Sequence, residues 1–510
     1  MKLNYKRTIL VGFAFFLISA FWQAYDAIVP LILTNHFGLD QLLSGIVMSI
    51  DNVLAIFMLP IFGALSDRIM TKFGKRTPFI FIGTIAAVLA FFSLTLIDSY
   101  QLRSVLDAGI AEKYQAATEL LKEANAALKE AGKAGDATAV ALAKESIDHI
   151  NKVVIAGIRK ETLDITLGNL WPIIGFIGVL LLTLISMATF RSPAVALMPD
   201  VTVKPLRSKG NAIINLMGTA GGILVLVLGM IFKTSGNKYM QYTGYVVAVC
   251  AMMIAGLAVF VATVKERKWA DEMAAETERL GLENTAPAED NVEKRSLSRA
   301  ELKSLFLILA SVALWYVGYN SITSKYSVYA TNILFFDFNL TLIIAQAAAI
   351  VAYIPVGIVA SKIGRRKTIL AGITMLTSAF FIANFINFST PEFAMYPVFI
   401  LAGIGWATIN VNSFPMVVEL AKGGEVGKYT GYYYTASMAA QIIAPILSAA
   451  IYKLVGYMVG GDDIEGMRYV FFAFGTFFVA MSFITMFFVK HGDAKPEAQG
   501  ALESLAGADD

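Results

Sequence analysis

Two short turns with the same glycine and cation pattern occur in the two halves of the chain. One occupies residues 63–76 and the other residues 357–367, and each separates two long apolar stretches. Clustered Lys and Arg side chains cannot lie in hydrocarbon, so both turns are predicted to sit at a membrane surface. Their repetition predicts two related bundles of membrane helices in one polypeptide, an arrangement typical of proteins that move a solute across a membrane.

The composition agrees with a membrane protein. Of the 510 residues, 57% are hydrophobic and only 15% are charged, which is too little polar surface to cover a water-soluble globule of this size. The net charge is only +3 and the cations are confined to turns, so no nucleic-acid partner is expected. Cys250 stands alone, which excludes an intramolecular disulfide and a thiolate metal cluster.

A hydrocarbon core is crossed by about 20 apolar helical residues. Twelve segments of the chain meet this requirement: 8–34, 41–66, 77–97, 170–198, 209–232, 241–264, 302–330, 339–360, 367–387, 394–419, 428–452 and 467–489. With this count, most Lys and Arg residues of the short loops fall on one side. The asymmetry predicts that both termini lie in the cytoplasm. We expect a multi-pass protein of the cell (cytoplasmic or inner) membrane.

The spans divide into two predicted bundles with soluble segments between and after them. We expect an N-terminal six-helix bundle at 1–264, a cytoplasmic linker at 265–301, a C-terminal six-helix bundle at 302–489 and a cytoplasmic tail at 490–510. Within the linker, Ser298 and Glu301 have the spacing of a capping box before the seventh span.

Residues 98–168 form an insertion between the third and fourth spans. The segment is rich in Ala, Lys and Glu, and its apolar residues recur at helical spacing, so it is predicted to form an antiparallel helical hairpin on the extracytoplasmic face. A solvated insertion with a packing role and a substrate-collecting lid or partner surface both remain open.

Polar and aromatic side chains within the spans mark a candidate site. Ionisable groups are costly in the bilayer, so Asp26 and Asp51 are candidates for proton coupling, and Arg191 for a counter-charge or a forked donor to hydroxyls. Aromatic platforms mixed with amides suit a sugar ring, although such residues also mark membrane interfaces and join helices. The predicted substrate-binding residues are Trp22, Gln23, Tyr25, Asn52, Arg191, Asn215, Tyr316, Tyr319, Asn320, Trp406 and Asn410.

The cationic turns are predicted to form a breakable cytoplasmic gate. Asp67 lies close in sequence to cations and to helix N-termini, which favours charge-assisted bonds. In the second turn Ser361 replaces the acid, so the stronger latch is expected in the first half; the alternative is that the cations only fix topology. The predicted gate residues are Gly63, Asp67, Arg68, Gly74, Arg76, Asp200, Arg207, Gly364, Arg365, Arg366 and Glu419.

Two stretches carry a family resemblance. Ser66-Asp67-Arg68 followed by residues 73–80, and residues 191–200 continuing to 207–212, resemble the second-to-third and fourth-to-fifth helix regions of the major facilitator superfamily. Within that superfamily, both stretches resemble the form found in plant sucrose carriers and related animal sugar carriers. The superfamily resemblance covers nearly the whole chain except the insertion and the tail.

This resemblance implies an all-α fold with twelve transmembrane helices in two six-helix pseudo-repeats. It also implies uptake of a neutral glycoside, a disaccharide such as maltose or sucrose, by cation symport with alternating access. Apart from the resemblance, we expect a monomer. We favour proton over sodium because the sequence shows no cluster of carbonyl and carboxylate oxygens. The fourth span departs from the sucrose-carrier pattern, because residues 177–183 contain no acid before Arg191. Either Asp26 or Asp51 takes that role, or the protein is an uncoupled facilitator.

Signals of catalysis are sparse. His36, His149 and His491 are scattered through predicted loops and the tail, no spacing indicates a metal site, and no glycine pattern indicates a nucleotide. We therefore predict that the chain is not an enzyme and uses no cofactor. The alternatives are an exporter or facilitator of another small solute, a multi-pass membrane enzyme, and a non-transporting sugar sensor.

Overall fold

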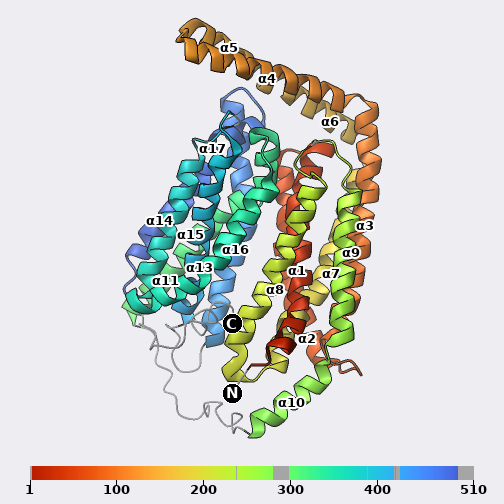
Figure 1. The fold of residues 1–510 in the computed structure, drawn as a ribbon, viewed down its shortest axis with the longest axis vertical. Coiled ribbons are helices and arrows are strands. Elements are labelled where there is room, and N and C mark those ends of the chain that lie inside the picture. Colours follow the sequence, from red (N-terminus) through yellow and green to blue (C-terminus); the bar gives the residue numbers. More distant parts are fainter. Residues whose placement is uncertain are drawn as a thin grey trace.

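The computed structural model describes residues 3–236, 238–279, 298–387, 389–418, 420 and 426–491. Its regular structure is helical (Figure 1). Within the described residues, eleven helices are long and apolar enough to cross a membrane, and the apolar stretch Phe338–Tyr353 lies in the position of the remaining predicted span. The predicted all-α, twelve-helix polytopic architecture is confirmed.

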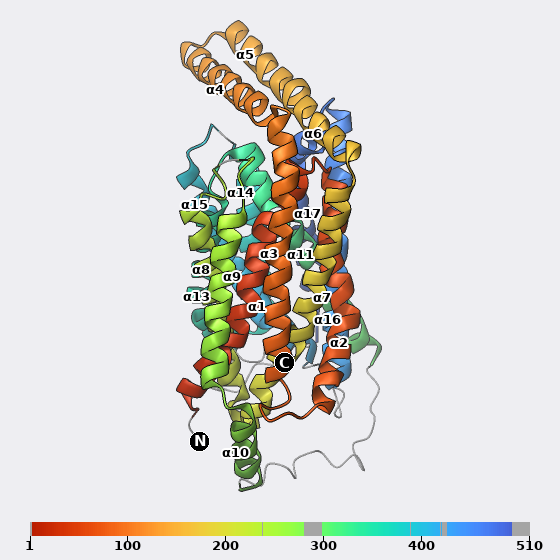
Figure 2. The same cartoon turned by 90° about the vertical axis from the view of Figure 1, so that its right-hand side faces the viewer.

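Among the described residues, the first half contains six long helices. They are α1 (Tyr5–Leu31, continued by the π-helix Ile32–His36), α2 (Gln41–Arg68), α3 (Thr77–Asp107), α7 (Trp171–Val201), α8 (Lys204–Ile231) and α9 (Thr243–Thr263). Helix α1 packs mainly against α8 and α9. Helix α10 (Glu266–Arg279) follows at one end of the molecule (Figures 1 and 2).

The second half repeats the pattern beside the first. Its helices are α11 (Arg299–Thr323), α12 (Tyr326–Tyr329, continued by the π-helix Ala330–Leu334), α13 (Phe338–Ile363), α14 (Arg365–Ala383), the 3-10 turn Glu392–Ala394, α15 (Met395–Val418), α16 (Val426–Met458) and α17 (Asp463–Phe487). The predicted capping box is present: Ser298 Oγ accepts from the Glu301 amide at 3.2 Å, and the Glu301 carboxylate accepts from the Ser298 amide at 2.9 Å.

A helical hairpin crosses one end of the bundle. It consists of α4 (Ile110–Ala134), α5 (Ala137–His149), the π-helix Ile150–Ile155 and α6 (Ala156–Gly168). Helix α3 runs on to Asp107, so the hairpin begins about a dozen residues later than position 98. Gly109 makes the turn with a φ of +69°, a conformation that favours glycine. We call this end of the molecule the hairpin end and the opposite end the α10 end (Figure 2).

The extension of α3 has a buried polar cause. Asp98 pairs with His36 Nδ1 at 2.6 Å, and both side chains are almost fully buried. Gln101 donates to the His36 carbonyl at 3.0 Å and to Thr166 Oγ1 at 2.9 Å. His36 therefore lies in a helix and inside the core, which corrects the expectation that it occupies a loop.

Polar contacts join the two halves at the hairpin end. Lys325 is fully buried and donates to Ser44 Oγ at 2.8 Å. The Asp463 carboxylate accepts from the backbone amide of Gln41. The same interface holds three more contacts, which are Lys453–Asp40 at 2.7 Å, Ser235–Asp337 at 2.8 Å and Arg159–Asp462 at 2.5 Å. These contacts close the hairpin end.

Candidate functional site

Aromatic and charged side chains of the first half gather on α1, α2 and α7. The guanidinium of Arg191 lies over the Trp22 ring at 5.5 Å, and the Tyr25 ring stands nearly perpendicular to Trp22 at 5.4 Å. Trp22 Nε1 and the Tyr25 hydroxyl are buried and have no hydrogen-bond partner among the described residues. The cluster thus offers polar groups that a bound molecule can satisfy.

The two aspartates of the first half have different surroundings. Asp51 Oδ1 accepts from Asn52 Nδ2 at 2.8 Å, and Arg191 attracts the same carboxylate electrostatically. Asp26 is an exposed side chain on α1, most of whose apolar residues are buried. Since most of α1 is buried, the accessible surface of Asp26 indicates that this side chain borders a gap between the helices.

An aromatic stack on the second half comes from α11, α13 and α15. Trp315 stacks on Tyr316 at 3.9 Å, and Tyr319 stacks on Trp406 at 5.9 Å. Tyr353 of α13 contacts the Trp406 ring edge-on at 6.3 Å. The stack presents ring faces and phenol hydroxyls from three helices.

The two clusters meet between the halves. Gln346 of α13 donates to Gln23 of α1 at 2.7 Å, which is a direct hydrogen bond across the interface. Asp26 lies near Tyr319, and Arg191 lies near Tyr434 of α16. The structure therefore brings most of the predicted binding residues to one central region.

The remaining amides lie around this region with other contacts. Asn320 donates to the Tyr316 carbonyl of its own helix at 2.8 Å, so its nitrogen is engaged locally. Asn215 lies on α8, which packs along α1, and Asn410 lies one turn after Trp406 on α15.

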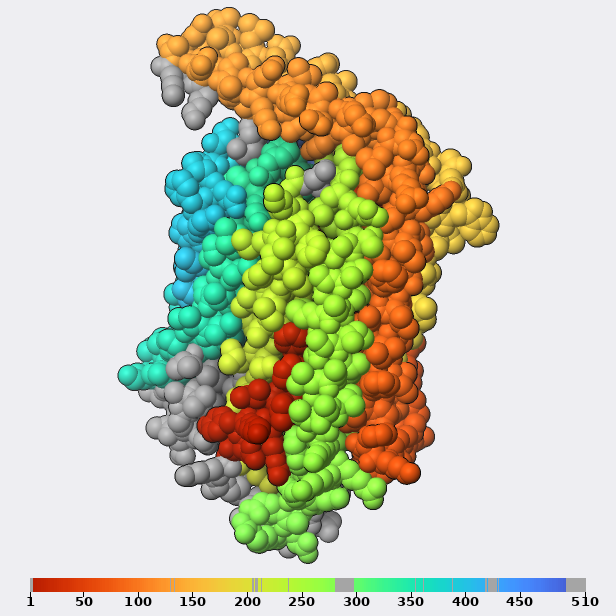
Figure 3. Space-filling view, turned by 45° about the vertical axis from the view of Figure 1, so that its right-hand side comes forward, coloured from red at the N-terminus to blue at the C-terminus, as the bar shows by residue number. Residues whose placement is uncertain are grey.

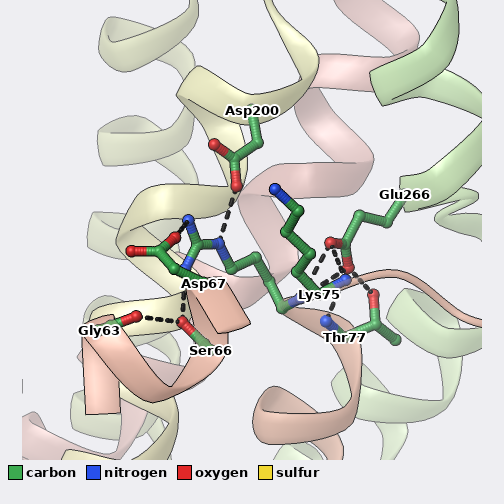
Figure 4. Close-up of polar contacts among 8 residues, drawn as sticks. Gly63, Ser66, Asp67, Lys75, Thr77, Asp200 and Glu266 are labelled. Carbon is green, nitrogen blue, oxygen red and sulfur yellow. Dashed lines mark hydrogen bonds and ion pairs between the residues drawn. The ribbon is translucent and has the colours of Figure 1, made fainter. Parts of the chain in front are cut away.

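The predicted latch at the α10 end is centred on Arg76, whose partners Ser66, Asp67 and Asp200 are labelled in Figure 4. Arg76 is 5% exposed and donates to Asp200 at 2.7 Å, to Asp67 at 2.5 Å and to Ser66 Oγ. Burial alone would lower the pKa of Arg76, but bonds to Asp200 and Asp67 raise it, so the guanidinium stays charged. The latch thus ties the ends of α2 and α7 to the start of α3.

Glu266 completes this region and was missed from the sequence. Its buried carboxylate accepts from the amides of Lys75, Arg76 and Thr77 at 2.6, 2.8 and 2.7 Å, and so caps the N-terminus of α3. Gly74 has a φ of +119°, and a Cβ there would clash with the Glu266 carboxylate. Only glycine fits, which explains its place in the motif.

The second turn is built differently. Gly364 again adopts a positive φ, +93°, and Arg366 donates to the Phe487 carbonyl at the end of α17. A cation there is favourable because the carbonyls at a helix C-terminus carry partial negative charge. Gly63 packs near Ser192, and Arg68 is exposed. Arg365 lies at the start of α14. The Arg207 side chain and Glu419 lie outside the described residues.

Three central or interface residues were not predicted. Gln346 and Tyr353 are seven residues apart on α13, a spacing that places them on one helix face and was readable from the sequence. Lys325 follows α11 directly, and its burial against the other half depends on tertiary packing. The described residues contain no group of three potential metal ligands.

Two family models match the chain. The model described as Major Facilitator Superfamily matches residues 326–507, and the model described as MFS/sugar transport protein matches residues 10–99. No curated protein matches the sequence. Both models describe the major facilitator superfamily of membrane transporters, so the expected resemblance to that family is confirmed, as is the expectation of a transporter rather than an enzyme.

Solved transporters share the fold. The inward-open xylose transporter XylE from E. coli is 15% identical, with 98% of this chain and 99% of that chain covered and a TM-score of 0.55. The nucleoside transporter NupG is 14% identical over 96% and 100%, with a TM-score of 0.51. A bacterial homologue of the human drug peptide transporters PepT1 and PepT2 is 11% identical over 95% and 97%, with a TM-score of 0.57.

Proposed function

We propose that the protein is a secondary active transporter that takes up a neutral glycoside, a disaccharide such as maltose or sucrose, by proton symport. The meeting of the Trp22, Asp26 and Arg191 cluster with the Tyr319–Trp406 stack between the halves carries this proposal. The ring faces suit the C–H face of a sugar, and the charged and amide groups suit its hydroxyls. The match of residues 10–99 to a sugar transport model supports the same substrate class.

The structure represents the inward-facing state in this proposal. The hairpin end is closed by Lys325–Ser44, Lys453–Asp40 and Arg159–Asp462, whereas the mid-span Asp26 is exposed. The positive-inside pattern assigns the α10 end to the cytoplasm. Proton coupling resides at Asp26 or Asp51, and the protein acts as a monomer in the cell membrane, with both termini on the cytoplasmic side.

Uptake into proteoliposomes tests the proposal. Maltose, sucrose, xylose and uridine are each offered with and without an inward-directed proton gradient, and a protonophore is added as a control. We expect a disaccharide to accumulate above its external concentration only with the gradient. The Trp406→Ala variant serves as a matched protein control and is expected to lose uptake. Accumulation of uridine alone would contradict the proposal and indicate a nucleoside carrier. Sugar entry at the same rate with and without the gradient would indicate a facilitator.

A further inference from the structure

A large groove lies beneath the hairpin, away from the central site. Its volume is about 1410 Å³, and its walls come from α4, α5, the turn at residues 235–239 and the loops of the second half that carry Thr331, Phe335 and Asn387. Figure 3 shows the hairpin overhanging the second half, with a hollow beneath its tip. None of the predicted substrate-binding residues lines this groove.

Lys238 is the notable residue of the groove wall. It is only 6% exposed, and its ammonium lies 4.1 Å from the centre of the Tyr114 ring. Tyr239 packs edge-on against Tyr114 at 5.7 Å. Within the part of the chain that the structure describes, the Lys238 ammonium has no carboxylate or other oxygen partner. Asp462 offsets part of the cost of this burial electrostatically but does not contact the ammonium, so an anion entering the groove would stabilise the charged form of Lys238.

The charged groups around Lys238 also favour the binding of an anion. Burial, together with the nearby cation Arg159, holds the pKa of Lys238 well below its usual value, and Asp462 opposes this shift only in part. Arg159 Nε is itself buried without a partner among the described residues. Lys122 and Lys144 also line the groove, and the acid that lines it, Asp148, is paired with Lys152 at 2.9 Å. An anion in the groove would therefore meet several cations and little repulsion.

The other lining groups indicate the body of the ligand. Tyr114 and Tyr239 supply aromatic surface, while Thr118, Asn125 and Asn387 supply hydroxyl and amide groups. Ligand pockets commonly measure about 300–1,000 Å³, so this groove has room for a ligand of several sugar rings.

We propose that the groove is a second binding site, which takes a carboxylate-bearing oligosaccharide whose acid group pairs with Lys238. The sugar hydroxyls of this ligand contact the amides and hydroxyls of the groove. The site is independent of the solute that the central region carries.

Calorimetry on the purified full-length protein tests the site. The probes are maltobionate, in which the reducing end of maltose is oxidised to a carboxylate, with maltose and sodium sulfate for comparison. We expect maltobionate to bind the parent at least tenfold more tightly than maltose does at this site, and sulfate to bind weakly. Lys238→Gln should weaken maltobionate at least tenfold. Lys160→Gln, an exposed lysine of α6 that does not line the groove, should leave the affinity unchanged.

Two further variants separate the possible outcomes. Trp22→Ala changes the central site and should not alter maltobionate affinity. If Lys238→Gln fails to fold, the double variant Lys122→Gln/Lys144→Gln replaces it and should weaken binding several-fold. The proposal is overturned if maltobionate does not bind, if the groove variants bind it as the parent does, if Trp22→Ala removes the binding, or if sulfate binds as well as maltobionate.

Discussion

At the scale of single residues, Asp51 is the better placed candidate for carrying the coupled proton. Its carboxylate accepts from Asn52 and is attracted by Arg191, which in turn lies over Trp22. Protonation of Asp51 would therefore release Arg191 for a bound sugar. Asp26 is exposed and lies opposite Tyr319, a position that suits contact with sugar hydroxyls.

The first prediction separates these two roles. Asp51→Asn should abolish uphill sugar accumulation driven by a pH gradient but keep sugar-for-sugar exchange, because exchange moves no net proton. Asp26→Asn should reduce both activities at least tenfold if Asp26 binds hydroxyls. Both activities are measured with radiolabelled sugar in proteoliposomes. If both variants accumulate sugar as the parent does, neither acid carries the proton.

The second prediction concerns the geometry of Arg191. An ammonium cannot reproduce the planar guanidinium stacked over Trp22, so Arg191→Lys should lose uptake nearly as fully as Arg191→Ala. We expect at least a tenfold fall in the initial uptake rate for both. Thr189→Ala is the control, since the exposed Thr189 hydroxyl donates to the Ile185 carbonyl of its own helix at 2.9 Å. Full activity of the Lys variant would show that transport needs only the positive charge of Arg191 and not its planar guanidinium.

At the scale of elements, the hairpin is tied to the second half of the molecule. Arg159 of α6 pairs with Asp462, the N-cap residue of α17, and both side chains are largely shielded from solvent. Opening of the hairpin end must break this pair. The hairpin thus contributes to closure of that end, in addition to packing on its own half.

The third prediction is a charge exchange at this pair. Arg159→Asp and Asp462→Arg should each destabilise the closed hairpin end, by about 1–3 kcal/mol for a partly buried ion pair, and the double exchange should restore much of the loss. The measurement is the distance distribution between spin labels at the exposed positions Leu167 and Tyr457, introduced as cysteines. Single variants that match the parent would show that the pair does not hold the end closed.

The elements themselves were largely predictable. Apolar length predicts the spans, and capping chemistry predicts the start of α11 at Ser298. The end of α3 was not predictable, because Asp98 and Gln101, read alone, indicate that the chain has left the membrane. Their burial depends on His36 and Thr166, which are distant in sequence. Glu266 likewise falls in the charged linker that the sequence predicts, since nothing local shows that it caps α3.

At the scale of the whole molecule, the closed hairpin end depends on close approach of backbone as well as on charge. A Cβ on Gly45 of α2 would lie 2.6 Å from the Pro445 carbonyl oxygen of α16, so the two halves touch there without a side chain between them. The approach of Gln23 to Gln346 depends on the same packing of one half against the other. The sequence therefore predicts the polar residues of the site but not their partners across the interface.

The fourth prediction uses this contact. Gly45→Ala should force the halves apart at the hairpin end and shift the population toward the state open there, seen as a longer distance between labels at Leu167 and Tyr457. Gly178→Ala, at a position with no neighbour within 4 Å, should leave the distances unchanged. Labelling is practical because Cys250, the only cysteine, is buried. Equal distance distributions in the parent and the Gly45 variant would contradict the prediction.

The packing of α10 against the first half determines where the polypeptide can be divided into two co-expressed fragments. Trp269 is 7% exposed beneath the Arg7 guanidinium, and Glu272 pairs with Arg7 at 2.5 Å, so α10 is anchored to the first half. A cut at residue 264 would assign Glu266 to the wrong fragment and leave the amides of residues 75–77 without their acceptor. A cut after Arg279 keeps the cap with the helix that needs it, and this is the place at which two separately made fragments should reassemble into a working pair.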